Sequence, residues 1–498
     1  MANVVVIGAG MGGMACAARL ASKGHQVTVL EHSPTWGGKL GIVEHEGHLF
    51  DTGPSLLTLP AVYRDLFLKT GAAIEDSIEI VDLDTAFRYQ FADGTVLKMP
   101  GVGIGRCAEA IGDTLGGSSA EQWRAFMKRA AKMWAITRKP FLESELHGLS
   151  SLVSMSWRLG DLRTIAPTKT LREMAQQYIS DPRLLTLVDR YATYTGSDPR
   201  QAPAALATVP YVEQMFGAYH VAGGLRELGR ALYERACAIG VKFEFSCTVE
   251  NISANPVING VTLEGGRFIA ADIVVANADA SNVYGSLLTG EALARTTSAT
   301  KSLRKATPSL SGFVILLAMS GETPDFEHHN VFFPSNYDDE FDSVFGIGKN
   351  ACPVPDPTIY ICTPKDSKMS PPGSESWYVL VNAPRHDKKA GMDWSVESLS
   401  QSYASSVLKT LSSRGVAVDA RVKWQEVISP ADLERNTLAP GGSIYGSSSN
   451  GMRSAFLRPE NTTKIPNLYL VGGSAHPGGG LPLVGMSAEI VASRIGRA

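Results

Sequence analysis

The most constraining feature of this 498-residue chain lies within its first 31 residues. A β-branched run, Val4 to Ile7, precedes the glycine-rich turn Gly8 to Gly13, and an Ala-rich stretch then reaches Gly24. A second β-branched run, Val27 to Leu30, ends at Glu31. This order of strand, G-x-G-x-x-G turn, helix, strand and acid is typical of a unit that binds a dinucleotide.

The glycines of this turn each have a physical role. Gly8 permits the tight turn, Gly10 lets backbone N–H groups approach a pyrophosphate, and Gly13 lets helix and strand pack closely. The helix N-terminus, at Met11 and Gly12, adds partial positive charge beside the phosphates. The alternative is an ordinary glycine-rich loop, but a helix, a strand and an acid in register favour nucleotide binding.

The residues around Glu31 indicate which nucleotide is bound. Its carboxylate is placed to accept both ribose hydroxyls, and no Arg follows to receive a 2′-phosphate, which disfavours NADP. The pair Gly37 and Gly38, with Lys39 after it, can bring backbone and a basic side chain to the same pyrophosphate. This pair resembles the second glycine signature of the flavoprotein superfamily that holds amine oxidases, phytoene desaturases and the Rab escort and GDP-dissociation-inhibitor proteins. The resemblance implies FAD rather than NAD.

Composition and charge bear on other classes of protein. The chain is long enough for two or three domains, and its net charge of −3 argues against nucleic acid as a partner. Its six cysteines form no C-x-x-C, so we expect reduced thiols and predict no metal site. No apolar run reaches about 18 residues and we recognise no signal peptide, so we expect a cytoplasmic protein. Peripheral attachment to the inner face of the cell membrane is a further option.

Residues 121 to 172 differ in charge from the rest of the chain. They hold ten bases and four acids, a local net charge of +6, and the bases alternate with bulky apolar residues such as Trp123, Phe126, Trp134 and Trp157. Bases and aromatics on helices suit an anionic membrane surface. The alternative is an ordinary amphipathic helical subdomain with a solvated basic face.

The middle of the chain is rich in predicted strands. Residues 85 to 98 indicate a hairpin around Asp93-Gly94, and residues 309 to 433 indicate a mixed or antiparallel sheet. Residues 241 to 252 and 272 to 278 are interpreted as strands of the nucleotide sheet. Gly101 to Gly105 superficially repeats the glycine fingerprint but is interpreted as a loop, because we expect neither a helix nor an acid-tipped strand to follow it.

The C-terminal end gives the second strongest signal. The predicted strand Asn467 to Val471 leads into the glycine-rich segment Gly472 to Pro482, and a helix is expected from there to about Arg497. A flat isoalloxazine ring needs backbone amides close to its N1 and O2, and glycines permit that approach. The following helix N-terminus stabilises negative charge on the ring. We therefore expect Gly472, Gly473 and Leu483 to contact the cofactor.

Five segments together resemble the FAD-dependent carotenoid desaturases of the bacterial phytoene desaturase family. They are Gly8 to Lys39, Asp51 to Pro54, Arg190 to Gly196, Tyr219 to Gly224 and Ser443 to Gly480. The piece from His476 to Gly480 is the most specific, and the resemblance is greatest to the branch acting on hydroxylated or partly desaturated carotenoids.

This resemblance implies further contacts and a reaction. The segment Asp51 to Pro54 is expected to lie beside the flavin, with a simple Gly-Pro turn as the alternative. Ser55 and the backbone of Val249 are also expected to lie against FAD. The reaction implied is desaturation of a long apolar polyene by hydride transfer to flavin N5, with a quinone or oxygen as the electron acceptor. A carotenoid oxygenase or ketolase of the same family and a flavin amine oxidase are the alternatives. A prenyl-lipid carrier is disfavoured because the glycine fingerprint is intact.

The expected fold is α/β with a discontinuous, Rossmann-like FAD-binding domain. We assign this domain to residues 1–84, 213–285 and 440–498, a mixed-sheet substrate domain to 85–120 and 286–439, and a helical, membrane-contacting subdomain to 121–212. No catalytic acid or base is identified. Glu213, Arg453 and His476 are candidates, with a structural role as the alternative for each.

Overall fold

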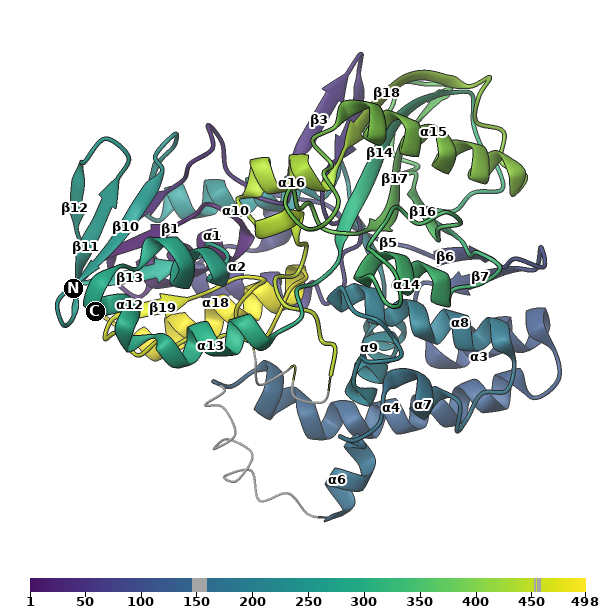
Figure 1. Ribbon diagram of the computed structural model, residues 1–498, viewed down its shortest axis with the longest axis horizontal. Coiled ribbons are helices and arrows are strands. Elements are labelled where there is room, and N and C mark those ends of the chain that lie inside the picture. Colours follow the sequence, from purple (N-terminus) through teal and green to yellow (C-terminus); the bar gives the residue numbers. More distant parts are fainter. Residues whose placement is uncertain (146–158, 452–453, 455–457) are drawn as a thin grey trace.

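The computed structural model describes residues 1–145, 159–451, 454 and 458–498. A five-stranded parallel sheet at one end of the molecule contains both the N-terminal and the C-terminal strand (Figure 1). Its order is β19-β13-β1-β2-β9. The strands are β1 (Asn3–Ile7), β2 (Gln26–Leu30), β9 (Lys242–Glu244), β13 (Ile273–Ala276) and β19 (Leu468–Leu470). With α1 (Met11–Ser22) between β1 and β2, the predicted strand–turn–helix–strand order is confirmed.

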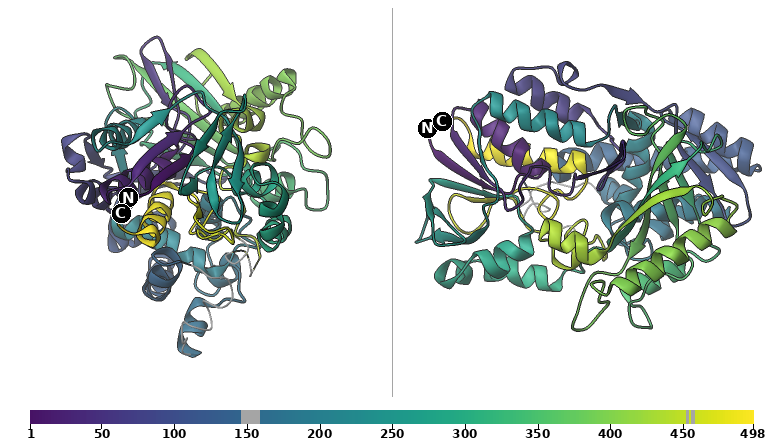
Figure 2. Two further views of the ribbon diagram at one scale, coloured as in Figure 1. Left: turned by 90° about the vertical axis from the view of Figure 1, so that its left-hand side faces the viewer. Right: turned by 90° about the horizontal axis from the view of Figure 1, so that it is seen from above.

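The two faces of this sheet bury alternate residues. Val4 and Val6 pack against a layer of helices, whereas Val5 and Ile7 pack on the opposite side against a small second sheet. The helices are α1, α2 (Ala61–Thr70), α10 (Arg226–Ala238) and α18 (Leu481–Ile495), which lie side by side in the right-hand view of Figure 2. A β-branched strand buried on both faces in this way is typical of a parallel sheet.

The small second sheet corrects one prediction. It consists of β10 (Val249–Ala254), β11 (Ile258–Leu263) and β12 (Phe268–Ala270), and all its pairs are antiparallel. Assigning residues 248 to 252 to the nucleotide sheet was therefore wrong. Val249 and Ile252 are buried as a strand requires, but they pack onto the face of the nucleotide sheet rather than extending its edge. Hydrophobic alternation identifies a strand without identifying its partner.

A seven-stranded sheet, in the order β18-β14-β17-β16-β15-β6-β7, forms the other half of the molecule (Figure 1). Its strands are β6 (Thr85–Gln90), β7 (Val96–Pro100), β14 (Ser311–Ser320), β15 (His329–Phe332), β16 (Ile359–Cys362), β17 (Ser374–Ala383) and β18 (Val422–Ile428). Only β6 and β15 pair in parallel, so the predicted mixed sheet is confirmed. On β14, Phe313 and Ile315 pack against α15 (Glu397–Ser413), whereas Gly312 and Val314 line a cavity.

A helical layer covers the lower right of Figure 1. It contains α3 (Ile104–Leu115), α4 (Ser119–Leu142), α6 (Leu159–Ile165), α7 (Leu171–Ala175), α8 (Pro182–Arg190) and α9 (Thr208–Phe216). The expectation that no helix follows Gly101 to Gly105 was wrong, because α3 begins at Ile104 within this segment. Trp123 and Phe126 of α4 are fully buried, which is incompatible with a place at a membrane headgroup. Their spacing continues through Met127, Ala130 and Met133 as one buried helix face.

Shorter elements connect these layers. They are β3 (Ile42–His45), β4 (His48–Asp51), β5 (Ile80–Asp82), β8 (Tyr219–Val221), α11 (Ala280–Asn282), α12 (Gly290–Arg295), α13 (Thr297–Lys305), α14 (Asp338–Phe345) and α16 (Pro430–Thr437). All six cysteines are free thiols. Within the described ranges we find no helix with both the length and the hydropathy needed to span a bilayer. The domain boundaries given above stay a prediction.

Candidate active site

One large cavity, of about 1570 Å³, lies where the carboxyl ends of the parallel strands face the seven-stranded sheet and the helical layer. This volume exceeds the roughly 300–1,000 Å³ of most small-molecule sites, so it can hold a cofactor and a long substrate together. Of the residues predicted to contact the cofactor, all except Gly13 line it: Gly8, Gly10, Met11, Gly12, Glu31, Gly37, Gly38, Lys39, Pro54, Ser55, Val249, Gly472, Gly473 and Leu483.

The turn after β1 is closed by contacts that leave no room for side chains. Gly8 has a φ of +95°, and a Cβ on Gly13 would lie 2.1 Å from the carbonyl oxygen of Gly8. Gly13 therefore serves the packing of the turn rather than the cavity wall. A Cβ on Gly10 would lie 2.9 Å from Nδ2 of Asn277, a cavity residue directly after β13 that the sequence analysis missed. Its only sequence signal is its place at the end of a buried strand.

The carboxylate of Glu31 supports the same turn. It is buried at the end of β2, and it accepts hydrogen bonds from the backbone N–H of Ala9 at 2.6 Å and of Ser33 at 2.9 Å. Nδ1 of His32 lies 2.7 Å from Oε1 of Glu31, the oxygen that also accepts from Ser33. Burial raises the pKa of Glu31, but these hydrogen bonds outweigh it and bring the pKa below its ordinary value. The group is therefore ionised at neutral pH, as a ribose acceptor must be.

The second glycine pair lies directly against the first turn. The backbone N–H of Gly37 donates to the carbonyl of Ala9 at 2.9 Å, and a Cβ on Gly38 would lie 3.3 Å from Cα of Gly10. Lys39 departs from the expected picture of a free ammonium at the pyrophosphate. Its Nζ donates to the carbonyl oxygens of Ser443 at 2.8 Å and Ile444 at 2.7 Å, and burial lowers its pKa to about 8.

The C-terminal glycine segment meets the first turn across the sheet. A Cβ on Gly472 would lie 2.5 Å from Oδ1 of Asn277, so this backbone approach also requires glycine. The guanidinium of Arg458, which the sequence analysis did not select, donates to the carbonyl oxygen of Gly473 at 2.7 Å. His476 is buried and lies 3.0 Å from the carbonyl oxygen of Ser144, and burial lowers its pKa to about 4. The hydrogen bond and the lowered pKa favour a structural role for His476, and its assignment stays a prediction.

The turn after β4 continues the cavity wall. Asp51 is buried and accepts hydrogen bonds from the backbone N–H groups of Leu225 and Arg226 at the start of α10, so it holds this helix rather than facing the cavity. Ser55 does line the cavity, and its Oγ lies 2.6 Å from the hydroxyl of Tyr360 on β16. This pair ties the nucleotide side of the cavity to the seven-stranded sheet.

A cluster of polar side chains lines the cavity at the junction with the helical layer. Glu213 of α9 is buried and accepts hydrogen bonds from the hydroxyls of Tyr191 at 2.6 Å and Tyr194 at 3.0 Å. The guanidinium of Arg190 donates to the same Tyr194 hydroxyl at 3.1 Å. Burial raises the pKa of Glu213 above its ordinary value, and the hydrogen bonds oppose this only in part. Arg453, the remaining catalytic candidate, lies outside the described residues.

The rest of the cavity wall is mainly apolar. Trp134, Phe141 and Leu142 of α4 contribute to it, with Leu162 and Ile165 of α6. Together the glycine turns and the ionised Glu31 fit a dinucleotide, and the apolar wall fits an apolar substrate beside it. The arrangement thus offers a cofactor half and a substrate half within one enclosed space.

Comparison with known proteins decides the family. The model of the flavin containing amine oxidoreductase family matches residues 11–496. The chain belongs to this family. It is an oxidoreductase, and its cofactor is FAD, as the glycine signatures predicted. The cavity residues named above would hold the dinucleotide, although each individual contact stays a prediction.

Two curated relatives and one solved structure are similar to this chain along nearly its whole length. The chain is 33% identical to a 1-hydroxycarotenoid 3,4-desaturase of Flavobacterium sp. (strain P99-3), with 99% of each chain covered. It is 31% identical to a 4,4'-diapolycopene oxygenase of Methylomonas sp, covering 99% of this chain and 98% of the relative. Putrescine oxidase bound to putrescine shares the fold, with a TM-score of 0.66, 13% identity and coverage of 99% and 98%. The resemblance to carotenoid desaturases is confirmed.

Replacement of Gly10 by Val should abolish stoichiometric FAD binding. The new side chain would occupy the space against Asn277 and block backbone approach to the pyrophosphate. We expect Gly10→Val to purify with less than about a tenth of the wild-type flavin, whereas Gly105→Val, at a helical glycine with open space around it, keeps it. Flavin absorbance per chain is the measurement. A folded Gly10→Val protein with full flavin content would show that the turn does not hold the cofactor.

Proposed function

We propose that this protein desaturates a long apolar polyene of the carotenoid type, using FAD as the hydride acceptor. The observation that supports this most is the large cavity, in which the glycine turns of the dinucleotide site adjoin an apolar wall. The relative named 1-hydroxycarotenoid 3,4-desaturase, similar along the whole chain, supports the same substrate class. A polyene without charged groups would gain most of its binding free energy from burial against this wall.

The reaction requires two different hydrogen acceptors. When two adjacent sp³ carbons become a double bond, one C–H bond yields a hydride and the other a proton. Bound FAD supplies the hydride acceptor at N5. The protein must hold the polyene against the ring, exclude water and take up the proton.

Glu213 is the group we assign to take up the proton. It lines the cavity, it is buried, and both its oxygens are already oriented by tyrosine hydroxyls. A raised pKa makes a carboxylate a stronger base, which suits proton uptake near neutral pH. His476 is a weaker candidate, because burial lowers its pKa to about 4 and makes it a poor base.

Bound FAD would pass its electrons to a quinone or to oxygen, since the sequence carries a single complete Rossmann fingerprint and therefore indicates no separate site for a nicotinamide. Because a membrane quinone and an apolar polyene both dissolve in the lipid, we expect the protein to act at the inner face of the cell membrane. Leu162 of α6 lines the cavity and is itself 38% exposed, so the cavity wall reaches the surface at α6, as it also does at the exposed Leu438 after α16. Exposed bases of α4, among them Lys128, Lys132 and Lys139, would attract this side of the protein to anionic lipid.

The mass of the product distinguishes desaturation from oxygenation, the reaction for which the Methylomonas relative is named. In cells that make defined carotenoids, we expect each turnover to remove two hydrogens and to move pigment absorption to longer wavelength as conjugation grows. High-resolution mass spectrometry and absorption spectra of extracted pigments measure this. A product that gains oxygen, and forms only when O₂ is present, would assign the protein to the oxygenases. An amine oxidase would leave the pigments unchanged.

Replacement of Glu213 by Gln should slow desaturation about 100-fold or more, the usual scale for loss of a general base. Since the pKa of Glu213 is raised, the wild-type rate should rise with pH as the carboxyl ionises, at a pH above that of an ordinary glutamate, and this acid limb should vanish in Glu213→Gln. Glu340→Gln is the matched control, because Glu340 is also buried with a raised pKa but does not line the cavity. An unchanged acid limb in Glu213→Gln would exclude it as the base.

Attachment to membranes should depend on charge at α4. We expect the wild type to float with anionic liposomes, to detach at 1 M salt where the Debye length is about 3 Å, and to ignore neutral vesicles. The triple variant K128E/K132E/K139E should lose most of this binding. K388E/K409E/K423E, with three exposed lysines on the seven-stranded-sheet side, should keep it. Equal binding of both variants would show that α4 is not the attachment site.

A further inference from the structure

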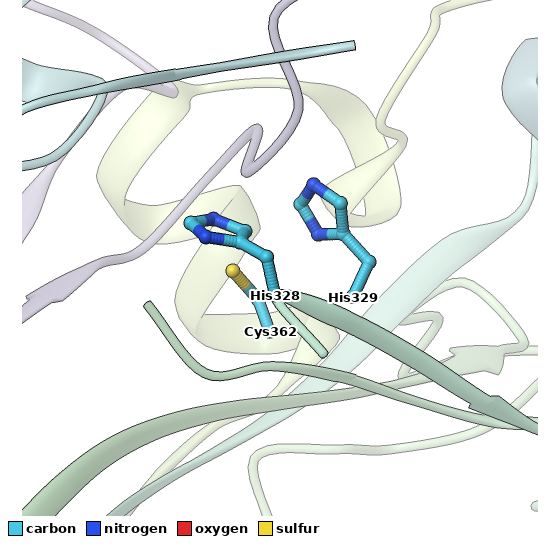
Figure 3. A group of neighbouring side chains, drawn as sticks. All are labelled: His328, His329 and Cys362. Atoms are coloured by element: carbon cyan, nitrogen blue, oxygen red, sulfur yellow. The ribbon is translucent and has the colours of Figure 1, made fainter. Parts of the chain in front are cut away.

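A second chemical site lies outside the cavity, where β15 and β16 pair. His329 stands directly opposite Cys362 in the antiparallel register of these strands, and His328 immediately precedes β15. One donor atom from each of the three side chains lies within 4.8 Å of the others. In Figure 3 the Cys362 sulfur lies beside the His328 ring, with the His329 ring next to it. All three residues are buried.

The two imidazoles each present a nitrogen that needs a partner. Nδ1 of His329 lies 2.8 Å from the Tyr360 hydroxyl, which leaves its Nε2 on the other side of the ring. Neither this Nε2 nor Nε2 of His328 makes a hydrogen bond within the described part of the chain. A buried polar atom without a partner is uncommon in a folded protein, so two unpartnered imidazole nitrogens in a cluster that also holds a thiol indicate a site for a ligand.

The donor atoms of the cluster suit a metal ion, because imidazole nitrogen and cysteine sulfur are ligands that soft metals prefer. Beside the cluster, His220 is held by Asp366 at 2.9 Å, and its ring lies 4.6 Å from that of His328, which limits the movement of the His328 ring.

We propose that His328, His329 and Cys362 bind one thiophilic metal ion, Cu(I). Thiolate and imidazole donors select Cu(I) and zinc among the common metals. Structural zinc almost always takes four ligands, whereas the described residues bring three to this cluster. A thiolate with a monovalent cation is also neutral overall, which lowers the cost of burial compared with a divalent ion.

The site is structural rather than catalytic. Its ligands are absent from the cavity wall, but His329 contacts Tyr360, whose hydroxyl meets Ser55 of the wall. A metal at this point would fix the ring of His329 and, through it, the strand that carries Tyr360.

The test is a metal titration of the FAD-loaded protein without oxygen. Cu(I) is added in competition with a chromophoric Cu(I) chelator, and X-ray absorption reports the atoms around copper. We expect one Cu(I) per chain with one sulfur and two nitrogen neighbours. Cys362→Ser should weaken binding at least 100-fold, whereas Cys107→Ser, which removes another buried thiol, should leave it unchanged. Flavin content checks that each variant is folded.

Several outcomes would overturn the proposal. They are no copper binding by the wild type at one equivalent, copper without a sulfur neighbour, and equal affinity in Cys362→Ser and the wild type. Tighter binding of Zn(II) than of Cu(I) to these residues would overturn the choice of ion. The wild-type titration decides the matter even if Cys362→Ser does not fold.

Discussion

The structure depends on one close approach of backbone, made by three segments around Asn277. Side chains on Gly10, Gly12 or Gly472 would each meet this residue at 2.9 Å or less. The segments come from β1, β13 and β19, which are neighbours in the sheet but far apart in the chain. Because parallel strands end at one edge, these turns necessarily meet there, and helix N-termini and amide groups gather at the same point. The cofactor half of the cavity follows from this geometry.

The substrate half follows from a second constraint, the alternation of β14. One face of this strand must pack against α15, so its other face is free to form a wall, and Gly312 and Val314 do so. The helical layer closes the space with Trp134 and Phe141. The proposed apolar substrate would therefore be enclosed by elements whose packing is already satisfied elsewhere. Because the buried cores lie on the opposite faces of these elements, the cavity wall can stay apolar and unfilled without weakening the cores.

The sequence predicts the parts of this arrangement that depend on local signals. Gly8 to Glu31 is such a part, since turn, helix and acid follow one another within one unit. Contacts between distant segments leave no comparable signal. Lys39 binding to the carbonyl of Ser443 and His329 facing Cys362 depend on register and layer order. The burial of Trp123 and Phe126 was predictable in principle, because their spacing matches one helix face. The bases between them equally fit a membrane-facing surface, so charge alone did not distinguish the two.

The polar cluster at the cavity wall shows how a buried charge can be kept chemically useful. The Arg190 guanidinium lies 5.1 Å from the ring centroid of Phe87 and 5.3 Å from that of Tyr194, and it donates to the Tyr194 hydroxyl that in turn donates to Glu213. At this separation its charge lowers the pKa of Glu213 only in part. A direct ion pair would lower the pKa of the carboxyl by about 1–3 units and make it a weaker base. With tyrosine between them, the aromatic rings stabilise the cation while the carboxyl keeps its raised pKa. Because a buried ion pair often adds no net stability, the separation of Arg190 from Glu213 is no large cost to the fold, and a cavity carboxyl with a raised pKa is a candidate for chemistry.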